Sequence, residues 1–414
     1  MSHSLAAPTS TAMLHCADYR TNFAELDRLL TRHVALWQIR PFHCRELCWI
    51  ESHPTLCDAL LKLDETALQA LESSEEALSQ WLCPWLGDDA RRLVALTRLP
   101  VVAQRERVAP ARFETGIPGR KWLQIQAFAA ALPQENTPLL EWCAGKGHLG
   151  RLLAVTDKRP VTSLEWQQAL CQAGLCEAQR MGAQMRFVHA DAFAPDSHRY
   201  LATGGHAVAL HACGDLHRTL IRHWAASTSS HLSLSPCCYH LIRNEYYEPL
   251  CDAAKKSALR LSKTDLHLAI EETVTGGRGA RRRRHTEVLW RLAFDEWQRE
   301  ARGLDQYLNV PAFPKSLLSG DFAAFQRWAA QEKGLAHAGP LDSAMWLAKG
   351  EARVRLVRRM ELVSHFFRRA LELWLALDAV LFLEASGAQV RLGIFCEKSL
   401  TPRNIFIDAR KVSL

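Results

Sequence analysis

In the middle third of this 414-residue chain, short apolar runs alternate with helical stretches, and this pattern restricts the fold more than any other feature. The runs between residues 138 and 236 are LLEWC, VTSLEW, RFVHA, AVALHA and HLSLSP, and most of them are separated by a segment with helical spacing. Parallel neighbouring strands need crossover connections, usually helices. We therefore expect an α/β domain with a doubly wound, largely parallel sheet covered by helices on both faces.

The segments on either side of this region have a different texture, which predicts helices. Residues 20–110 carry apolar residues three to four positions apart and show no strand-like alternation. Residues 255–375 are again helical, and two strand-like segments near the end, QVRLGIF and NIFIDA, are expected to pair at the sheet edge. The expected division is a helical N-terminal region (1–115), an α/β core (116–255), a helical insertion (256–375) and closing strands (376–414).

The composition favours a globular, cytoplasmic protein. Hydrophobic residues make up 48% of the chain, which is enough for a substantial core. The first residues lack the basic start and apolar run of a secretory signal, and the one stretch of more than 18 residues without Asp, Glu, Lys or Arg, residues 223–242, is interrupted by Ser and His. The 13 cysteines fall in predicted helices and strands rather than at regular loop spacings, which favours reduced thiols. No membrane partner is expected.

The net charge of +7 is compatible with an acidic partner such as RNA, because clustered Lys and Arg replace phosphate counterions. Two arginine clusters carry much of this excess. The first is Arg278, Arg281, Arg282, Arg283 and Arg284; the second is Arg353, Arg355, Arg358, Arg359, Arg368 and Arg369. A solvated helix face explains the second cluster as well as RNA binding does.

The strongest motif is EWCAGKGHLG, which runs from Glu141 to Gly150 directly after an apolar strand and opens a helix. Glycines let the backbone turn sharply and approach a ligand, and the helix N-terminus offers free N–H groups. Loops of this kind also bind NAD and FAD, although the three-glycine spacing of those enzymes is not matched here. The loop alone predicts a nucleotide-like ligand.

Two acidic positions narrow the ligand. Glu165 closes the second strand, 24 residues after Glu141, where a carboxylate can accept hydrogen bonds from both hydroxyls of a ribose, as it also does in NAD enzymes. Asp191 and Ala192 follow the third strand, where a carboxylate can meet the adenine amino group of S-adenosylmethionine. NAD-binding folds have no such requirement, so the third strand favours S-adenosylmethionine.

At these positions the chain resembles class I methyltransferases. Glu141, Gly145, Gly147, Glu165 and Asp191 match the cofactor positions of that superfamily in the same order. The resemblance implies a Rossmann-like doubly wound sheet with a final antiparallel edge strand, and S-adenosylmethionine as cofactor. The full set of expected cofactor-binding residues is Glu141, Cys143, Gly145, Gly147, Glu165, Trp166, Asp191, Ala192 and His211.

Three further segments resemble a narrower family, which includes the tRNA acceptor-stem 2'-O-methyltransferases and the methyltransferase domain of the glutathione-transferase C-terminal-domain-containing protein. The segments are HACGDL from His211, SPCCYH from Ser235 and TPRN from Thr401. This resemblance covers residues 118–250 and the last 35 residues. It implies methyl transfer and favours RNA (tRNA or rRNA) as acceptor, while a protein or small-molecule acceptor stays open because members of one family differ in substrate. A non-catalytic S-adenosylmethionine-binding scaffold is the alternative from another class.

The residues that end the fourth and fifth strands are expected to face the transferred methyl group, because ligands lie over the carboxyl ends of parallel strands. The candidates are His211, Asp215, Cys237 and His240. His211, Asp215 or His240 can act as base towards a hydroxyl acceptor, and Asp215 can equally cap the following helix.

Cysteine chemistry offers two further hypotheses. Cys213 and Cys237 stand where RNA cytosine-5 methyltransferases carry their two cysteines, although small buried cysteines at strand ends also serve packing alone. Cys44, Cys48, His53 and Cys57 fall within 14 residues and offer zinc ligands, but their spacing matches no zinc signature and the segment can form helices with cysteines on apolar faces. No metal is therefore expected.

Overall fold

The computed structural model describes residues 16–201, 204–271, 278–314, 317–318, 320–335 and 342–412. The chain divides into two compact units, each built from segments distant in sequence. Unit 1 comprises Met1–Arg32, Ala95–Glu271 and Arg368–Leu414, and unit 2 comprises His33–Val94 and Glu272–Phe367. The boundaries of these units fall inside the segments expected from the sequence, so each unit combines parts of several of them.

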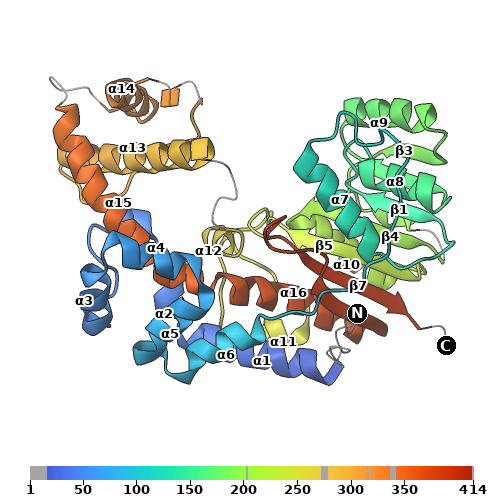
Figure 1. The fold of residues 1–414 in the computed structure, drawn as a ribbon, viewed down its shortest axis with the longest axis horizontal. Helices are drawn as coiled ribbons and strands as arrows, with labels where there is room; N and C mark the ends of the chain where they lie inside the picture. Colours follow the sequence, from blue (N-terminus) through green and yellow to red (C-terminus); the bar gives the residue numbers. More distant parts are fainter. Residues whose placement is uncertain are drawn as a thin grey trace, which may run out of the picture. The chain divides into compact units, whose positions relative to one another are not determined.

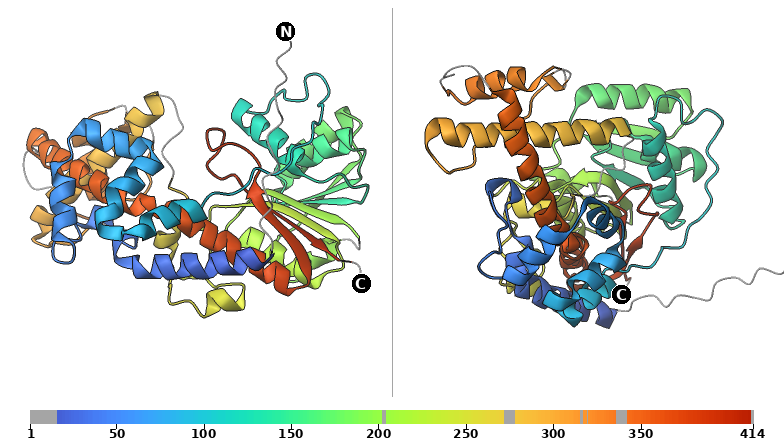
Figure 2. Two further views of the ribbon diagram at one scale, coloured as in Figure 1. Left: turned by 60° about the horizontal axis from the view of Figure 1, so that its bottom comes forward. Right: turned by 60° about the vertical axis from the view of Figure 1, so that its left-hand side comes forward.

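Unit 1 contains a seven-stranded sheet in the order β3-β2-β1-β4-β5-β7-β6 (Figures 1 and 2). The first five strands are parallel, and β7 pairs antiparallel with both β5 and β6. The strands are β1 (Leu139–Trp142), β2 (Val161–Glu165), β3 (Met185–His189), β4 (His206–Cys213), β5 (His231–Cys237), β6 (Ala388–Ile394) and β7 (Ile405–Lys411). The expected doubly wound sheet with an antiparallel edge is confirmed.

The strand order reverses between β1 and β4, and this reversal places helices on both faces. Right-handed crossovers from β1 through α8 (His148–Thr156) to β2, and from β2 through α9 (Gln168–Arg180) to β3, put these helices on one face. The crossover from β4 through α10 (Asp215–Ala226) to β5 runs in the opposite direction, so α10 covers the other face. Ligands of such sheets bind at the carboxyl ends of the strands near this reversal.

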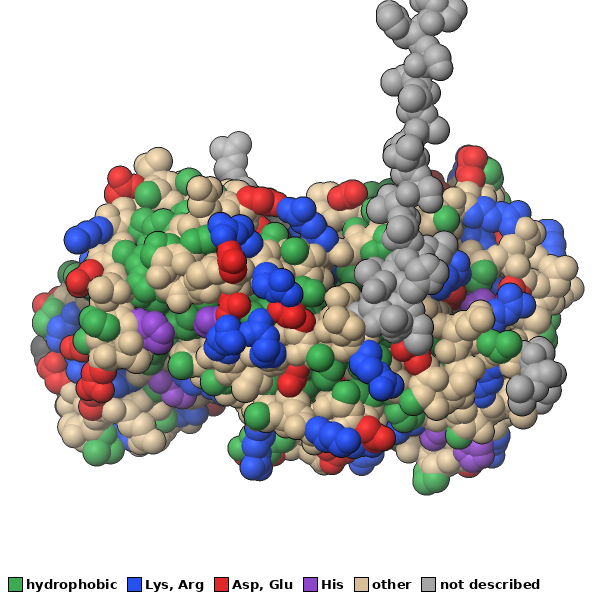
Figure 3. Space-filling view, turned by 90° about the horizontal axis from the view of Figure 1, so that it is seen from below, with side chains coloured by type: hydrophobic (Ala, Val, Ile, Leu, Met, Phe, Trp, Pro, Cys, Tyr) green, Lys and Arg blue, Asp and Glu red, His purple; other side chains and the backbone are tan. Residues whose placement is uncertain are grey.

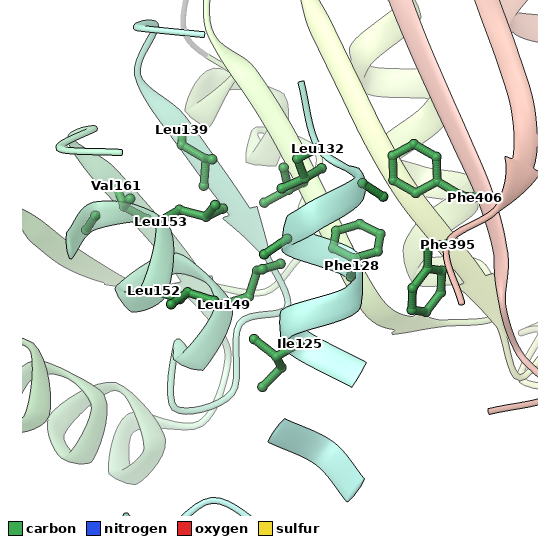
Figure 4. Packing of buried hydrophobic residues seen from close by; sticks show 14 of the residues in the cluster. Ile125, Phe128, Leu132, Leu139, Leu149, Leu152, Leu153, Val161, Phe395 and Phe406 are labelled. Atoms are coloured by element: carbon green, nitrogen blue, oxygen red, sulfur yellow. The ribbon is translucent and has the colours of Figure 1, made fainter. Parts of the chain in front are cut away.

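Buried apolar residues join α7 (Gly119–Ala131) to α8 and the sheet (Figure 4). Phe128 of α7 packs edge-on against Phe395 and Phe406, with ring centroids 5.5 and 5.4 Å apart. Leu149 and Leu153 of α8 belong to the same cluster. One core therefore holds β7, the turn after β6 and helix α8 together. The same core fixes α7 close to the carboxyl ends of the parallel strands.

Helix α1 (Cys16–Arg32) packs along α16 (Arg368–Ala385), which is why the expected N-terminal region does not stay together in space. The rings of Phe23 and Trp374 lie 5.3 Å apart, and the indole N–H of Trp374 donates to Asp27 at 2.9 Å. Unit 1 also contains α11 (Asp252–Lys255), α12 (Lys263–Leu268) and the 3-10 helix η2 (Ser197–Tyr200).

Unit 2 is helical in its described residues, with α13 packed along α15. Its elements are α2 (Val34–Trp37), η1 (Pro41–His43), α3 (Pro54–Lys62), α4 (Glu65–Ser73), α5 (Glu75–Leu86), α6 (Asp88–Leu96), α13 (Arg278–Arg302), α14 (Phe322–Glu332) and α15 (Ser343–Phe366). Its aromatic core includes Trp290, Phe294 and Phe325. No helix in the described ranges is long and apolar enough to cross a membrane.

Five of the six arginines in the second cluster have partners within their own unit, and the sixth, Arg355, is exposed as a solvated helix face predicts. Arg353 is buried and pairs with Asp295 and Glu296. Arg358 pairs with two glutamates of α4, and Arg359 donates to backbone carbonyls at the end of α3. In unit 1, Arg368 donates to the carbonyl of Glu271, and Arg369 binds Glu372 and Asn404. Periodicity cannot distinguish such internal partners from solvent or phosphate.

Candidate functional site

The loop between β1 and α8 turns through three residues with positive φ: Cys143 (57°), Gly145 (60°) and Gly147 (64°). Gly147 is the N-cap of α8, and a Cβ there would lie 2.7 Å from the ring of Phe187, so only glycine fits. A Cβ at Gly145 would meet nothing within 4 Å. One side of the loop is thus packed against β3, and the other, at Gly145, is open to a ligand.

Glu165, at the end of β2, is held rigidly against this loop. Its Oε2 accepts from the N–H of Gly145 at 2.9 Å, and its Oε1 accepts from the N–H of Gln167 at 3.0 Å. Each carboxylate oxygen has further lone pairs available after one such bond. The carboxylate is therefore oriented, and it can still accept from a diol.

Glu141 lies inside the fold beneath the loop. Its Oε2 accepts from the Ser163 hydroxyl at 2.7 Å, and a Cβ at Gly150 would come within 2.5 Å of the same oxygen. Burial raises the pKa of Glu141 to about 7, although the hydrogen bond from Ser163 acts to lower this pKa. These contacts assign Glu141 to the support of the loop, with α8 packed closely over it.

Three expected cofactor residues lie at the ends of β2 and β3. Trp166 follows Glu165 and is 67% exposed, so its ring is available to a ligand. Asp191 is exposed, and its Oδ1 accepts from the N–H of Phe193 at 2.8 Å, which orients the carboxylate. Ala192 is buried, so it contributes backbone and packing only.

His211 lies near the end of β4, where the strand departs from regular pairing. Its φ is 69°, and the register with β5 shifts between Leu210 and Cys213. Its Nε2 lies 3.0 Å from Oε1 of Gln124 on α7. Burial, together with the charge of Lys121, lowers the pKa of His211 below 6.5, so the ring is neutral at pH 7.

Asp215 is bound on both carboxylate oxygens. Oδ1 pairs with Arg218, and Oδ2 accepts from the N–H of Arg243 at 2.7 Å. The N-cap of α10 is Gly214, so Asp215 does not cap the helix in the way the sequence suggests. Its contacts tie the start of α10 to the loop after β5, which favours a positioning role over that of a base.

The end of β5 carries the remaining candidates. Cys237 is buried, and its Sγ lies 3.6 Å from that of Cys213. Hydrogen bonds with Cys213 and Cys238, together with burial, raise the pKa of Cys237, which disfavours a thiolate nucleophile at that position. The His240 ring contacts that of His267, with centroids 4.0 Å apart and planes tilted by 31°, and the buried Nδ1 of His240 has no hydrogen-bond partner among the described residues.

Sequence reasoning did not single out three residues of this region. Gln124 and Lys121 come from α7, and nothing in their spacing connects them to His211. Arg403 stands in the TPRN segment, so the motif offered a signal, although no role was assigned to it. Its charge acts on His211 and on Cys213, and its buried Nε has no partner among the described residues.

The N-terminal cysteine group lies in unit 2, where the thiols of Cys44 and Cys48 hydrogen-bond to each other. Cys44 donates to the carbonyl of Arg40, Cys48 contacts the sulfur of Met360 at 3.2 Å, and Cys57 is buried in α3. The His53 ring bonds to the Ser52 hydroxyl. Among the described residues these four side chains do not converge on one point.

Comparison with known proteins identifies the domain. Residues 120–245 match a family model described as a methyltransferase domain. A search of curated proteins gives no significant match.

Solved structures offer only weak likenesses. They include precorrin-6y C5,15-methyltransferase from Geobacter metallireducens (14% identity, 33% of this chain and 71% of that chain, TM-score 0.24). An uncharacterised protein from Listeria monocytogenes is 14% identical over 56% of this chain and 98% of that one, with a TM-score of 0.25. The 23S rRNA methyltransferase ErmE is 15% identical over 58% and 98%, with a TM-score of 0.24. Such scores support no argument about substrate.

The family match covers β1 to the loop after β5, which contains the glycine loop, Glu165 and Asp191. The expected methyltransferase domain is confirmed over these residues, and with it a methyl-transferring enzyme. The match ends before the helices of residues 256–375, so the acceptor stays undefined.

Proposed function

We propose that this chain transfers the methyl group of S-adenosylmethionine to RNA, with tRNA or rRNA as the substrate class. The observation that carries the cofactor part is the carboxylate of Glu165, fixed by two backbone N–H groups beside the open side of Gly145. In this proposal Glu165 accepts from the ribose hydroxyls, and Asp191 accepts from the adenine amino group. The exposed ring of Trp166 borders the adenine.

The acceptor part rests on charge and on the sequence resemblance to tRNA enzymes. Arg282, Arg283 and Arg284 are exposed near the start of α13, and none of the three has an ion-pair partner in the described part of the chain. The first turn of α13 contains no acidic residue. Positive charge at a helix N-terminus is unfavourable without an anionic partner, and a phosphate backbone supplies one. The side chains of Arg278 and Arg281 lie outside the described residues.

Positive and negative side chains are mixed on one face of the molecule. On the face drawn in Figure 3, Lys and Arg side chains are interspersed with Asp and Glu. A mixed surface attracts phosphate weakly, so local clusters decide where RNA binds. The run at Arg282–Arg284 is such a local cluster.

For a hydroxyl acceptor, we assign the base to His211. With Nε2 donating to Oε1 of Gln124, the lone pair lies on Nδ1, and the neutral ring can take the hydroxyl proton as the oxygen bonds to the methyl carbon. The bound cofactor supplies the methyl group on its sulfonium centre. The remaining residues at the site hold it and the acceptor in line.

Calorimetric titration with S-adenosylmethionine and S-adenosylhomocysteine tests the cofactor site. Asp191→Ala should weaken binding, whereas Asp196→Ala, in the same loop and half-exposed, should bind as the wild type does. Absence of binding to the wild-type protein would contradict the cofactor assignment. Equal affinity in both variants would contradict the role of Asp191.

RNA from a strain that lacks the gene, incubated with protein and labelled cofactor, tests the acceptor. Replacing Arg282, Arg283 and Arg284 by Ala should weaken RNA binding and reduce its salt dependence by up to about one unit of log–log slope for each phosphate that the variant no longer neutralises. The exposed Arg355 of α15 provides the control substitution. Label in protein or in small molecules, with none in RNA, would replace the RNA proposal.

A further inference from the structure

Three cysteine thiols converge at the carboxyl ends of β4 and β5. The Sγ atoms of Cys213, Cys237 and Cys238 all lie within 4.8 Å of one another, and those of Cys213 and Cys237 are 3.6 Å apart. Thiolates around a tetrahedral zinc ion, at Zn–S distances of about 2.3 Å, are separated by about 3.8 Å. The cluster is therefore close to the geometry of a thiolate metal site.

The convergence depends on two departures from regular strand geometry. Leu210 pairs with Ser235, but Cys213 pairs with Cys237, so β4 carries one more residue than β5 over this interval. A one-residue slip turns a side chain to the opposite face of a sheet, so the extra residue decides where Cys213 points. The positive φ of His211, 69°, lies within this interval.

The second departure is at Cys238. Successive side chains of a strand point to opposite faces, so two adjacent cysteines do not normally reach the same ion. Cys238 follows the end of β5 with a φ of 48°, which breaks the alternation and allows its thiol to lie beside that of Cys237. The alternation of side chains therefore does not prevent Cys237 and Cys238 from reaching one ion.

The surroundings fix these positions. The N–H of Gly214 donates to the carbonyl of Cys237 at 3.0 Å, and the N–H of Leu241 donates to the carbonyl of Cys238 at 2.9 Å. A Cβ at Gly214 would overlap the carbonyl oxygen of Leu241, so the two loops pack closely. The three thiols are therefore brought together by a tied backbone.

We propose that Cys213, Cys237 and Cys238 form a zinc site with three thiolate ligands and a fourth position open to water or to an acceptor atom. Thiolate ligands select zinc over hard cations, and an open fourth position distinguishes reactive zinc sites from closed structural ones. Three thiolates and one Zn²⁺ carry a net charge of −1. The charge of Arg403, which acts on Cys213 and Cys238, opposes it.

Zinc binding by these three thiols requires neither RNA nor the cofactor. The site does not include the other metal-compatible group in the described residues, Glu135, His206 and His231. In that group both nitrogens of His231 already bind carboxylates, and Nε2 of His206 bonds to Ser233. Of these two groups, the three-cysteine group is the better candidate, because its thiols are not engaged by carboxylates.

Elemental analysis of protein purified under reducing conditions tests the proposal. About one zinc per chain should remain after dialysis, and Cys213→Ser or Cys238→Ser should lose it. Cys176→Ser, an exposed cysteine of α9, should keep it. Zinc content unchanged in the Cys213 and Cys238 variants would overturn the site.

A second experiment uses the wild-type chain alone, so that misfolded variants cannot obscure the result. Metal-free protein titrated with Co²⁺ should gain thiolate-to-cobalt charge-transfer absorption that saturates at one equivalent, and Zn²⁺ should displace the cobalt. Metal should also protect Cys213 and Cys238 from alkylation, as read by peptide mass spectrometry, and leave Cys176 reactive. Absence of the absorption band in folded protein, or binding of Cu⁺ without Zn²⁺, would overturn the assignment.

Discussion

Gly145 and Gly147 are two positions apart in the loop after β1, yet alanine should affect them differently. At both positions a left-handed φ costs a non-glycine residue about 1–2 kcal/mol. At Gly147 the new Cβ would also lie 2.7 Å from Cζ of Phe187, and such overpacking adds about 1–3 kcal/mol. At Gly145 nothing lies within 4 Å. The expected losses in free energy of unfolding are about 1–2 kcal/mol for Gly145→Ala and about 2–5 kcal/mol for Gly147→Ala.

The order should reverse when cofactor affinity is measured. The open side of Gly145 is where the ligand approaches the backbone, so its Cβ should lower the affinity for S-adenosylhomocysteine by tenfold or more, about 1.4 kcal/mol. Gly147→Ala should bind within about threefold of wild type once the folded fraction is taken into account. Denaturant unfolding and calorimetry of both variants measure the two quantities. Equal destabilisation, or unchanged affinity in Gly145→Ala, would refute the division of the loop into a packed side and an open side.

Three further substitutions have signs fixed by the structure. Burial raises the pKa of Glu141 from 4.5 to about 7, so the folded protein keeps this proton at a pH where the unfolded chain loses it. The free energy of unfolding of the wild type should therefore fall as pH rises from 4.5 to 8. Relative to the wild type, the free energy of unfolding of Glu141→Gln should increase by about 3 kcal/mol over this range. His211→Asn should lower kcat by about 10²–10⁴ towards a hydroxyl acceptor while the exposed His198→Asn does not, and equal rates would exclude His211 as the base. Asp408→Asn should destabilise the fold by about 3–5 kcal/mol, because the bond to His231 is buried. Burial raises the pKa of Asp408, but the hydrogen bond from His231 lowers it further, so the net pKa in the folded state lies below the ordinary value. The loss caused by the variant should therefore shrink in acid, and a pH-independent loss would contradict this.

The sheet and the glycine loop were predictable because local patterns determine them. Apolar runs such as VTSLEW become buried strands, and the turn after β1 has a positive φ at Gly147, which glycine adopts without strain. The segments QVRLGIF and NIFIDA, which form β6 and β7, were likewise predictable as a strand pair at one side of the sheet. Each of these features depends on residues within one element or one turn.

The remaining features depend on contacts between distant segments. The bulge before Cys213 and the left-handed φ of Cys238 have no signature in residue type, since neither position is a glycine. From the sequence, Arg353 on α15 is interpreted as a solvated arginine, but in the fold it forms an ion pair with Asp295 of α13. Gln124 reaches His211 across 87 positions of sequence. Spacing along one helix or strand carries no information about such partners.

The two ends of β4 and β5 differ in how their buried polar groups are satisfied. At the amino ends, His231 bonds to Glu135 and Asp408, and Ser233 donates to Asp408 at 2.6 Å. At the carboxyl ends, the hydroxyl of Tyr239, Nδ1 of His240 and Nε of Arg403 are buried without partners in the described chain.

An unsatisfied buried polar group costs about 1–3 kcal/mol, so a fold retains several at one place only where something offsets the cost. Packing does not explain the difference, because β4 and β5 satisfy the buried polar groups at their amino ends. The carboxyl end is also where the reversal of strand order places ligands in open α/β sheets. Polar atoms of a bound acceptor would complete these hydrogen bonds, so acceptor binding should protect the loop after β5 from hydrogen exchange more than any segment at the amino ends of the strands.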